Sequence, residues 1–225
     1  MKGPTMFCKP SVVVSLCVLL VFAVCGTSLA EEASWQTLFD GTDVAAWQNA
    51  GGEAPSPGWA VEDGQLVRKD RAGYIWTKER FADFHLELEF KTAGNSGVFF
   101  RTDSLRDPVQ TGIEAQIYRP SEKPSRHSTG SLYDLLAPSK VADRPMGEWN
   151  EMAITAKDAH IVIVLNGEKI IDADLDQWTE ANQNPDGSRN KFNTPLKDFK
   201  RDGHIGLQDH GDAVSFRNIR IKRLP

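Results

Sequence analysis

Apolar and polar side chains alternate one by one along several short segments of this 225-residue chain. The clearest is residues 84–91, where four apolar residues alternate with a histidine, two glutamates and a lysine. Because successive side chains of a β-strand point to opposite faces, this period indicates a strand buried on one face and does not fit a helix. Glycine, proline, asparagine and aspartate separate the segments, which is typical of an all-β sandwich.

Other segments with alternating or β-branched residues predict further strands. They are residues 59–67, 73–77, 98–102, 114–118, 151–156, 161–165, 168–173, 205–208 and 214–222. Asn166 and Gly167 predict a tight hairpin, because a type I′ turn requires positive φ at both central residues, and Asp63–Gly64 is a second turn signal. Residues 119–147 and 176–202 are long and polar, as binding loops often are, and a short helix is predicted at 175–182.

The first thirty residues have the features of a secretory leader. Lys2 and Lys9 precede an apolar stretch at 11–24, which is short for a membrane span, and residues 28–30 have the small-x-small form of a cleavage site. We therefore predict a signal peptide at 1–30 and one domain at 31–225, exported to the periplasm or secreted. An uncleaved anchor and a lipoprotein signal at Cys25 are alternatives, although Val24 precedes Cys25 where a small residue is expected.

Cysteine content and charge narrow the function classes. All three cysteines lie in the leader, so the cleaved chain is predicted to have neither disulfides nor thiolate chemistry. A net charge of −5 does not favour nucleic acid or an anionic membrane surface. No second long apolar run follows the leader, which predicts no stable membrane insertion after cleavage. The sequence does not indicate an oligomeric state.

In some predicted strands, polar residues lie on the face opposite to the one that carries the apolar residues. In residues 113–118, Glu114, Gln116 and Tyr118 oppose three apolar residues. The residues expected to gather in this way on one sheet face are Arg101, Glu114, Gln116, Gln208 and His210. Such a set suits recognition of a polyhydroxylated ligand or acid–base chemistry on it. The alternatives are a structural ion pair between Glu114 and Arg101, and hydrogen bonds from Gln208 and His210 to turn backbone.

Several motifs together resemble one family, the 3-keto-disaccharide hydrolase domain. They are residues 37–43 with Trp47, 95–101, 112–117, 130–134, 147–150, 206–211 and 216–219. The resemblance extends over residues 35–224. It implies a concanavalin-A-like β-sandwich (jelly roll) of two antiparallel sheets, with long loops over a concave face. It also implies a carbohydrate substrate that is already oxidised to a ketone at C3.

A ketone at C3 makes the C2 proton acidic, so a substituent at C1 can leave by elimination, and water addition then completes a net hydrolysis. This route needs a base, a cation or donor for the enolate oxygen, and an acid for the leaving oxygen, and each acid–base group contributes ~10²–10⁴-fold. Because imidazole titrates near neutral pH, we assign His210 as the base. Glu114 is then the second acid–base group or the residue that orients the histidine. The reverse assignment of the two residues remains open. Arg101 is predicted to stabilise the enolate oxygen. The predicted substrate-binding residues are Gln116, Gln208, Tyr118, Tyr133 and Asp134.

Other readings of the same features remain. The fold also suits a non-catalytic carbohydrate-binding module or an adhesion domain, but two titratable groups on one face favour an enzyme, either hydrolase or lyase. The sequence predicts no cofactor, because it contains no EF-hand loop and no cysteine–histidine metal motif. A calcium ion held by Asp186, Asn190 or Asp209 is the alternative.

Overall fold

The computed structural model describes residues 1–5 and 34–225. The predicted signal peptide therefore lies largely outside the described residues. Residues 1–5 contain neither helix nor strand, and residues 34–225 lie in one compact unit defined by internal contacts. Within the described residues, no helix is both long and apolar enough to cross a membrane.

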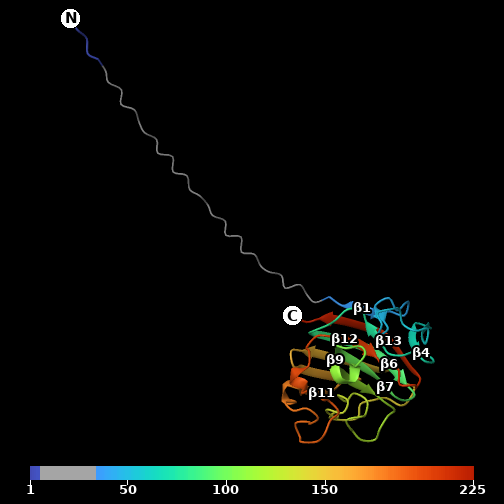
Figure 1. The fold of residues 1–225 in the computed structure, drawn as a ribbon. Coiled ribbons are helices and arrows are strands. Elements are labelled where there is room, and N and C mark those ends of the chain that lie inside the picture. Colours follow the sequence, from blue (N-terminus) through green and yellow to red (C-terminus); the bar gives the residue numbers. More distant parts are fainter. Residues whose placement is uncertain (6–33) are drawn as a thin grey trace. The chain divides into compact units, whose positions relative to one another are not determined.

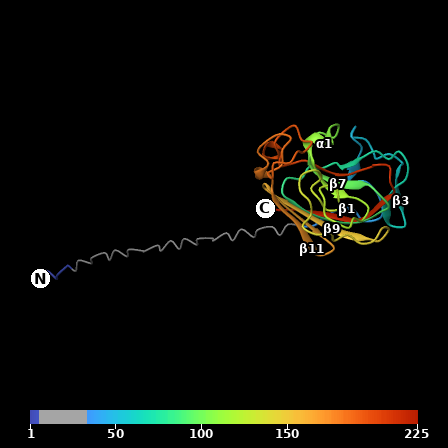
Figure 2. The ribbon, with the colours of Figure 1, turned by 90° about the horizontal axis from the view of Figure 1, so that it is seen from below.

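Two antiparallel sheets make up this unit (Figure 1). The eight-stranded sheet has the order β11 (Glu168–Asp174), β10 (His160–Leu165), β9 (Asn150–Lys157), β6 (Phe84–Thr92), β13 (Val214–Arg223), β4 (Gln65–Arg68) and β3 (Trp59–Glu62), with β1 (Gln36–Phe39) paired to β13. The five-stranded sheet has the order β2 (Trp47–Gln48), β5 (Ile75–Thr77), β12 (His204–Leu207), β7 (Ser96–Thr102) and β8 (Ile113–Ile117). Figure 2 shows β7 in one layer, and β9 and β11 in the other.

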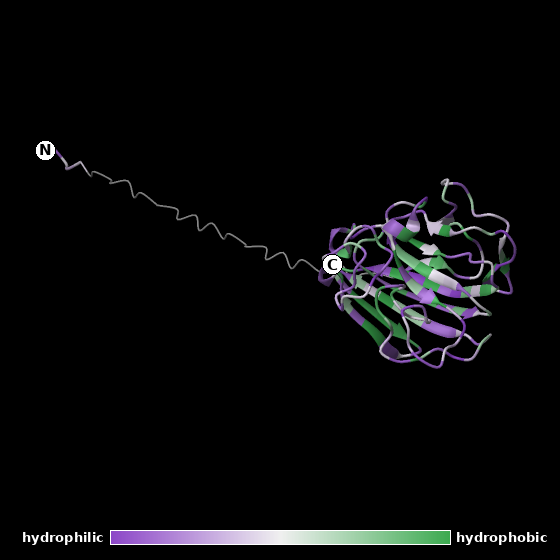
Figure 3. Cartoon of the chain, turned by 60° about the horizontal axis from the view of Figure 1, so that its bottom comes forward, coloured by the Kyte–Doolittle hydropathy of each residue, from purple (hydrophilic) through white to green (hydrophobic). Residues whose placement is uncertain are grey.

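The hydrophobic core lies between the two sheets. Strand β6 alternates strictly between buried and half-buried positions, which confirms the period seen at residues 84–91. The ring of Phe84 on β6 meets the ring of Phe100 on β7 edge-on, with centroids 6.1 Å apart. Figure 3 shows hydrophobic and hydrophilic residues alternating along the strands. The predicted all-β sandwich of two antiparallel sheets is confirmed, and burial of apolar area between them is its main source of stability.

Turns formed by residues with positive φ separate the strands at the two positions that the sequence predicted. Asn166 and Gly167 have φ angles of 51° and 82°, as the predicted hairpin requires. Positive φ at Asp63 and Gly64 likewise separates β3 from β4. The predicted helix at 175–182 is wrong in length, because only the 3₁₀ turn η1 (Leu175–Gln177) forms. Two other single turns are α1 (Pro108–Thr111), visible in Figure 2, and η2 (Leu196–Asp198).

The loop after β8 returns along the edge of that strand. The backbone N–H of Tyr133 donates to the carbonyl of Glu114 at 3.0 Å, and that of Gln116 donates to Ser131 at 3.0 Å. Leu132 pairs with Ala115 as an antiparallel bridge. Residues 130–133 therefore continue the five-stranded sheet beyond β8, and Tyr133 lies beside Glu114.

The second long loop docks against the first. Arg126 forms an ion pair with Asp186 at 2.5 Å, and the Asn184 side chain donates to the carbonyl of Asp134 at 3.3 Å. The backbone N–H of Lys191 donates to a carboxylate oxygen of Asp134 at 2.8 Å. The two loops predicted as binding loops thus hold each other beside β8.

Candidate active site

The five-stranded sheet has a second face, directed away from the core, which we call the outer face. On β7 and β8 the core side chains alternate with those of the outer face, so that Phe99 pairs with Glu114 and Gly97 pairs with Gln116 across the two strands. Gly206 of β12 pairs with Phe99 on one side and with Trp76 on the other. The outer face carries Trp76, Gly97, Phe99, Glu114, Gln116, Gly206 and Gln208.

Glu114 is the buried carboxyl group of the outer face. The residue is 6% exposed, and the amide nitrogen of Gln208 donates to its Oε1 at 3.0 Å. Burial raises the pKa of Glu114 to about 7, although the positive charge of Lys191 and the Gln208 hydrogen bond oppose the rise. A carboxyl group with this pKa can exchange a proton at neutral pH, which is what a general base or acid requires.

Lys191 and Tyr133 lie beside this carboxyl group. The Lys191 ammonium nitrogen is 3.9 Å from the centroid of the Tyr133 ring. Burial lowers the pKa of Lys191, while the charges of Glu114 and Asp134 raise it. Burial also raises the pKa of the Tyr133 hydroxyl, and the nearby Glu114 charge adds to this effect. The site therefore combines an acid, a cation and a phenol from three separate parts of the chain.

Aromatic rings and unpaired polar atoms complete the outer face. The rings of Tyr74, Trp76 and Phe99 lie with centroids 5.7 to 6.0 Å apart. Among the described residues, Trp76 Nε1, Gln116 Oε1 and Gln208 Oε1 are buried without a hydrogen-bond partner. Buried polar atoms are normally paired, so one donor and two acceptors on the same face indicate a place for a ligand with several hydroxyl groups.

Arg101 forms its ion pair with Asp83 and not with Glu114, and its side chain is not on the outer face, where strand alternation had placed it. Its φ of 50° turns the chain out of the strand conformation, so the alternation that placed it on the outer face ends there. The guanidinium is 1% exposed and donates to the Ala82 carbonyl, the Asp158 carbonyl and the Asp83 carboxylate at 2.9, 2.5 and 2.9 Å. Asp83 precedes β6 and Asp158 lies between β9 and β10, so Arg101 links the two sheets.

His210 lies beyond the end of β12. The strand ends at Leu207, and Asp209 then forms a turn by accepting the backbone N–H of Gly211 at 3.0 Å. The Asp209 carboxylate also binds Arg68 at 2.5 Å and the N–H of Gly73 at 2.8 Å. His210 is exposed, and its ring forms no hydrogen bond within the described chain. Gln208 is thus on the outer face, as predicted, whereas His210 stands at its exposed end.

The remaining predicted residues have identifiable contacts. The Tyr118 hydroxyl accepts a hydrogen bond from Arg119 at 2.8 Å. Gln116 donates to the side-chain oxygen of Asn95 at 3.0 Å. Asp134 has a φ of 64° and holds the Lys191 backbone. The Asp134 carboxylate therefore helps to position the backbone that carries Lys191.

The three residues suggested for calcium are engaged separately. Asp186 binds Ser188 and Arg126, the Asn190 side chain bonds Asn184 and the backbone of Phe192, and Asp209 binds Arg68. Within residues 1–5 and 34–225, no group of three or more His, Cys, Asp or Glu residues has a metal-binding arrangement.

Sequence reasoning missed four residues of the site, namely Tyr74, Trp76, Phe99 and Lys191. Tyr74 shares alternation parity with Trp76, so the predicted strand at 73–77 contained a signal for it. Lys191 lies in a polar loop without periodicity, and only the contact between the two long loops brings it to Glu114.

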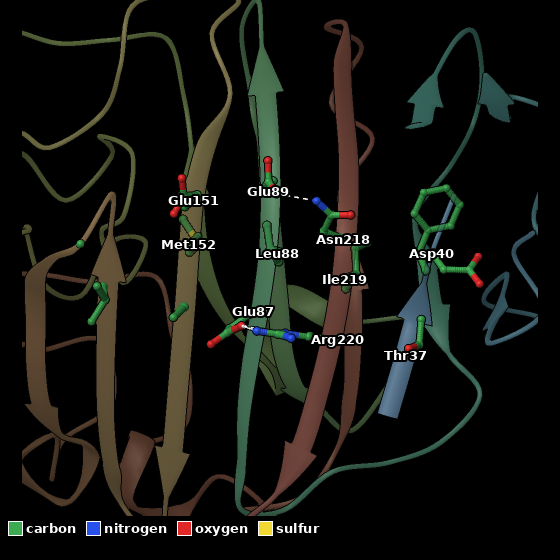
Figure 4. Close-up of a pocket in the computed structure, with 14 residues that line it drawn as sticks. Thr37, Asp40, Glu87, Leu88, Glu89, Glu151, Met152, Asn218, Ile219 and Arg220 are labelled. Carbon is green, nitrogen blue, oxygen red and sulfur yellow. Dashed lines mark hydrogen bonds and ion pairs between the residues drawn. The ribbon is translucent and has the colours of Figure 1, made fainter. Parts of the chain in front are cut away.

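A cavity of about 650 Å³ lies elsewhere, on the eight-stranded sheet, and includes residues of β1, β6, β9 and β13 (Figure 4). Two of its carboxylates have partners within the cavity lining: Arg220 binds Glu87, and the Asn218 amide binds Glu89. Burial favours the neutral form of Glu87, but hydrogen bonds from Arg220 and His85 outweigh this and hold its pKa below the ordinary value. None of the residues that line this cavity belongs to the outer face.

Known proteins resemble this chain over most of its length. It is 28% identical over 225 residues to the 3-keto-disaccharide hydrolase of Bacteroides thetaiotaomicron, a match that covers 84% of this chain and 78% of the relative. The crystal structure of a provisionally assigned glycosyl hydrolase from Parabacteroides distasonis superposes with a TM-score of 0.74 at 32% identity, covering 85% of this chain and all (100%) of the other. A Bacillus subtilis protein of unknown function with a galectin-like fold, at 13% identity, TM-score 0.53 and coverages of 84% and 94%, agrees in fold alone.

The match to a family model is consistent with these likenesses. Residues 34–222 match the model described as the 3-keto-alpha-glucoside-1,2-lyase-like domain, which confirms the resemblance inferred from the sequence motifs. All five strands of the smaller sheet, and both loops beside β8, fall within the matched range. The chain therefore belongs to the 3-keto-alpha-glucoside-1,2-lyase-like domain family.

Proposed function

We propose that this protein is an enzyme that cleaves glycosides oxidised to a ketone at C3, by removing the C2 proton and eliminating the C1 substituent. The observation that carries the proposal is Glu114, a buried carboxyl group with a pKa of about 7 on a face with unpaired hydrogen-bonding atoms. The related 3-keto-disaccharide hydrolase and the family of the chain support the same substrate class.

In the proposed reaction Glu114 is the base, which is the second of the two assignments considered for Glu114 and His210. Its carboxylate takes the proton from C2, and the electron pair moves into the C3 carbonyl to give an enolate. When the enolate collapses, a C1–C2 double bond forms and the C1–O bond breaks, while the departing oxygen takes a proton. Burial favours this role because it raises the pKa of Glu114 to about 7. A carboxylate with such a pKa is basic enough to accept the proton, and a fraction of the protein molecules still has it ionised at neutral pH.

The other predicted site residues have supporting roles in the proposal. Gln116 and Gln208 present amide oxygens without partners in the described chain, which suits binding of substrate hydroxyls. Tyr133 is next to Glu114 and can assist the departing oxygen together with Tyr118. His210, at the exposed end of the face, is the candidate to deliver a proton to the leaving group or to activate water. Water addition to the unsaturated product gives hydrolysis, and release before addition gives a lyase outcome.

We also propose export as the location of this activity. Lys2, Lys9 and the apolar stretch at 11–24 support a leader that is removed after residue 30. The test is detection of the mature N-terminus by mass spectrometry of the exported fraction. Recovery of only the full-length chain from the cytoplasm contradicts export.

The activity test compares a 3-keto-disaccharide with its unoxidised parent. We expect the wild-type protein to release the leaving sugar from the keto form alone, and Glu114→Gln to reduce kcat by ~10²–10⁴-fold. Glu122→Gln is the matched control, because Glu122 is exposed in the loop after β8. In heavy water, the wild type should also exchange the C2 hydrogen for deuterium, which NMR detects. Binding of the keto-sugar without exchange or cleavage indicates a carbohydrate-binding module and overturns the proposal.

A further inference from the structure

We propose that Lys191 is the group that contacts the C3 oxygen of the substrate and stabilises the enolate with its ammonium charge. This rests on the proposed function and assigns the role that the sequence had suggested for Arg101. The first support is position. Tyr133 is hydrogen-bonded through its backbone to Glu114, and the Lys191 ammonium lies 3.9 Å from the centroid of the Tyr133 ring. The charges of Lys191 and Glu114 also act on each other, so the cation lies within electrostatic reach of the carboxyl group that takes the proton.

The backbone N–H and the backbone carbonyl of Lys191 both form hydrogen bonds with side chains. Its N–H donates to Asp134 at 2.8 Å, and its carbonyl accepts the side-chain amide of Gln110 at 2.9 Å. Lysine has a long flexible side chain, so fixing its backbone and placing its ammonium over a ring reduces the number of positions it can take. A preorganised cation stabilises a developing oxyanion without the energetic cost of reorientation during the reaction.

The hydrogen-bonding capacity of Lys191 is available for a ligand. Within the described chain its ammonium forms neither a hydrogen bond nor an ion pair, whereas Lys69, Lys140 and Lys200 each bind a carboxylate. The residue is half-buried, so this charge has lost part of its hydration without forming a direct ion pair within the described chain. An enolate oxygen supplies an anionic partner during the reaction.

Three arginines that could supply a cation instead of Lys191 already bind other groups. Arg101 donates to three acceptors at the junction of the two sheets. Arg126 binds Asp186, and Arg68 binds Asp209. Lys191 is also the cation whose charge acts on Glu114, lowering the pKa that burial raises. The same charge that favours the ionised base can therefore favour the enolate once the proton has moved.

The step is balanced without another reactant. The C2–H bond breaks, its proton goes to Glu114, and its electron pair becomes the C2–C3 π bond as the C3 oxygen acquires negative charge. Lys191 remains protonated and donates a hydrogen bond to that oxygen. The pair then returns to form the C1–C2 double bond as the C1–O bond breaks, and the departing oxygen keeps the pair of that bond and takes a proton from an acid of the site, for which His210 is the candidate.

The experiment measures C2 hydrogen exchange and cleavage separately, for the wild type, Lys191→Met and Lys191→Arg. We expect Lys191→Met to lose ~10²–10³-fold in both exchange rate and kcat, with a smaller change in KM, and Lys191→Arg to recover part of the loss. Lys197→Met is the control, because Lys197 is exposed in the same long loop. Thermal unfolding confirms that the variants are folded.

The pH profile distinguishes a catalytic contact from a structural one. Removing the Lys191 charge removes an influence that lowers the pKa of Glu114, so the acid limb of kcat/KM should move to higher pH in Lys191→Met. A folded Lys191→Met with wild-type exchange and an unchanged acid limb overturns the role of Lys191 while the proposed function stands. A borohydride-trapped adduct on Lys191 also overturns it, because it indicates an imine. If the wild type itself neither exchanges C2–H nor cleaves the keto-sugar, the proposed function fails instead.

Discussion

The carboxylate of Glu114 lies directly over the α-carbon of Gly97 on the neighbouring strand. A β-carbon at Gly97 would be 2.3 Å from Oε1 of Glu114, far inside contact distance. The pair is formed across β7 and β8, where Gly97 pairs with Gln116 and Glu114 with Phe99. The missing side chain at residue 97 is therefore what allows the carboxyl group to lie on the sheet and reach Gln208.

The variant Gly97→Ala should displace this carboxyl group. We expect kcat/KM for a 3-keto-disaccharide to fall about 10²-fold, since misplacement of a catalytic group by about 1 Å has an effect of this order. The measurement is steady-state kinetics with thermal unfolding as a check on folding. In a Glu114→Ala background the same change should have little further effect. An equal loss in both backgrounds shows that Gly97 acts in some other way.

Replacing Glu114 with glutamine should stabilise the protein at alkaline pH relative to the wild type, although it lowers kcat. The folded-state pKa of about 7 exceeds the ordinary value of 4.5, so the native state binds more protons than the unfolded state between these values. The stability contributed by this group is therefore lost as pH rises through that window, by roughly 3 kcal/mol. Glutamine does not ionise and avoids this loss.

Urea denaturation at pH 5 and pH 8 tests this expectation. The free energy of unfolding of Glu114→Gln relative to wild type should increase between the two pH values. Other titrating groups are common to both proteins and cancel in the comparison. A difference that stays constant between pH 5 and pH 8 contradicts the raised pKa of Glu114.

Arg101 should prove to be a structural residue. Arg101→Met removes the guanidinium from the Asp83 carboxylate and from two carbonyls at the junction of the sheets, and we expect a loss of about 3 kcal/mol in the free energy of unfolding. The specific activity of the folded fraction, measured well below the melting temperature, should remain within a few-fold of wild type. A variant that is as stable as the wild type but inactive would show that Arg101 acts in catalysis.

Asp134 should act by positioning Lys191. Asp134→Ala removes the acceptor of the Lys191 N–H, a hydrogen bond to a charged group worth ~1.5–3 kcal/mol, and we expect a roughly 10- to 100-fold loss of kcat/KM. Asp134→Asn retains a side-chain oxygen and should lose less. Amide hydrogen exchange at Lys191 provides an independent measurement, and it should become faster in Asp134→Ala. Unchanged exchange with lost activity indicates that Asp134 meets the substrate directly.

Strand periodicity is local, and this is why much of the fold could be predicted. Residues 84–91 alternate because one face is buried, and Asn166–Gly167 turns because both residues accept positive φ. The same logic placed Glu114, Gln116 and Gln208 opposite the core. It failed at Arg101, where a positive φ ends the alternation, and at His210, where the turn of Asp209 intervenes.

The sequence by itself determined the all-β class, the family resemblance and which side chains of each strand avoid the core, because these depend on neighbours in the chain. The tertiary structure decided which of those side chains meet. Only strand pairing brings Gly97 under Glu114 and Gln208 beside it. Only the docking of two aperiodic loops brings Lys191 to the same carboxyl group, and the burial that results raises the pKa of Glu114 to about 7. Desolvation depends on the whole fold, so no local pattern contains it.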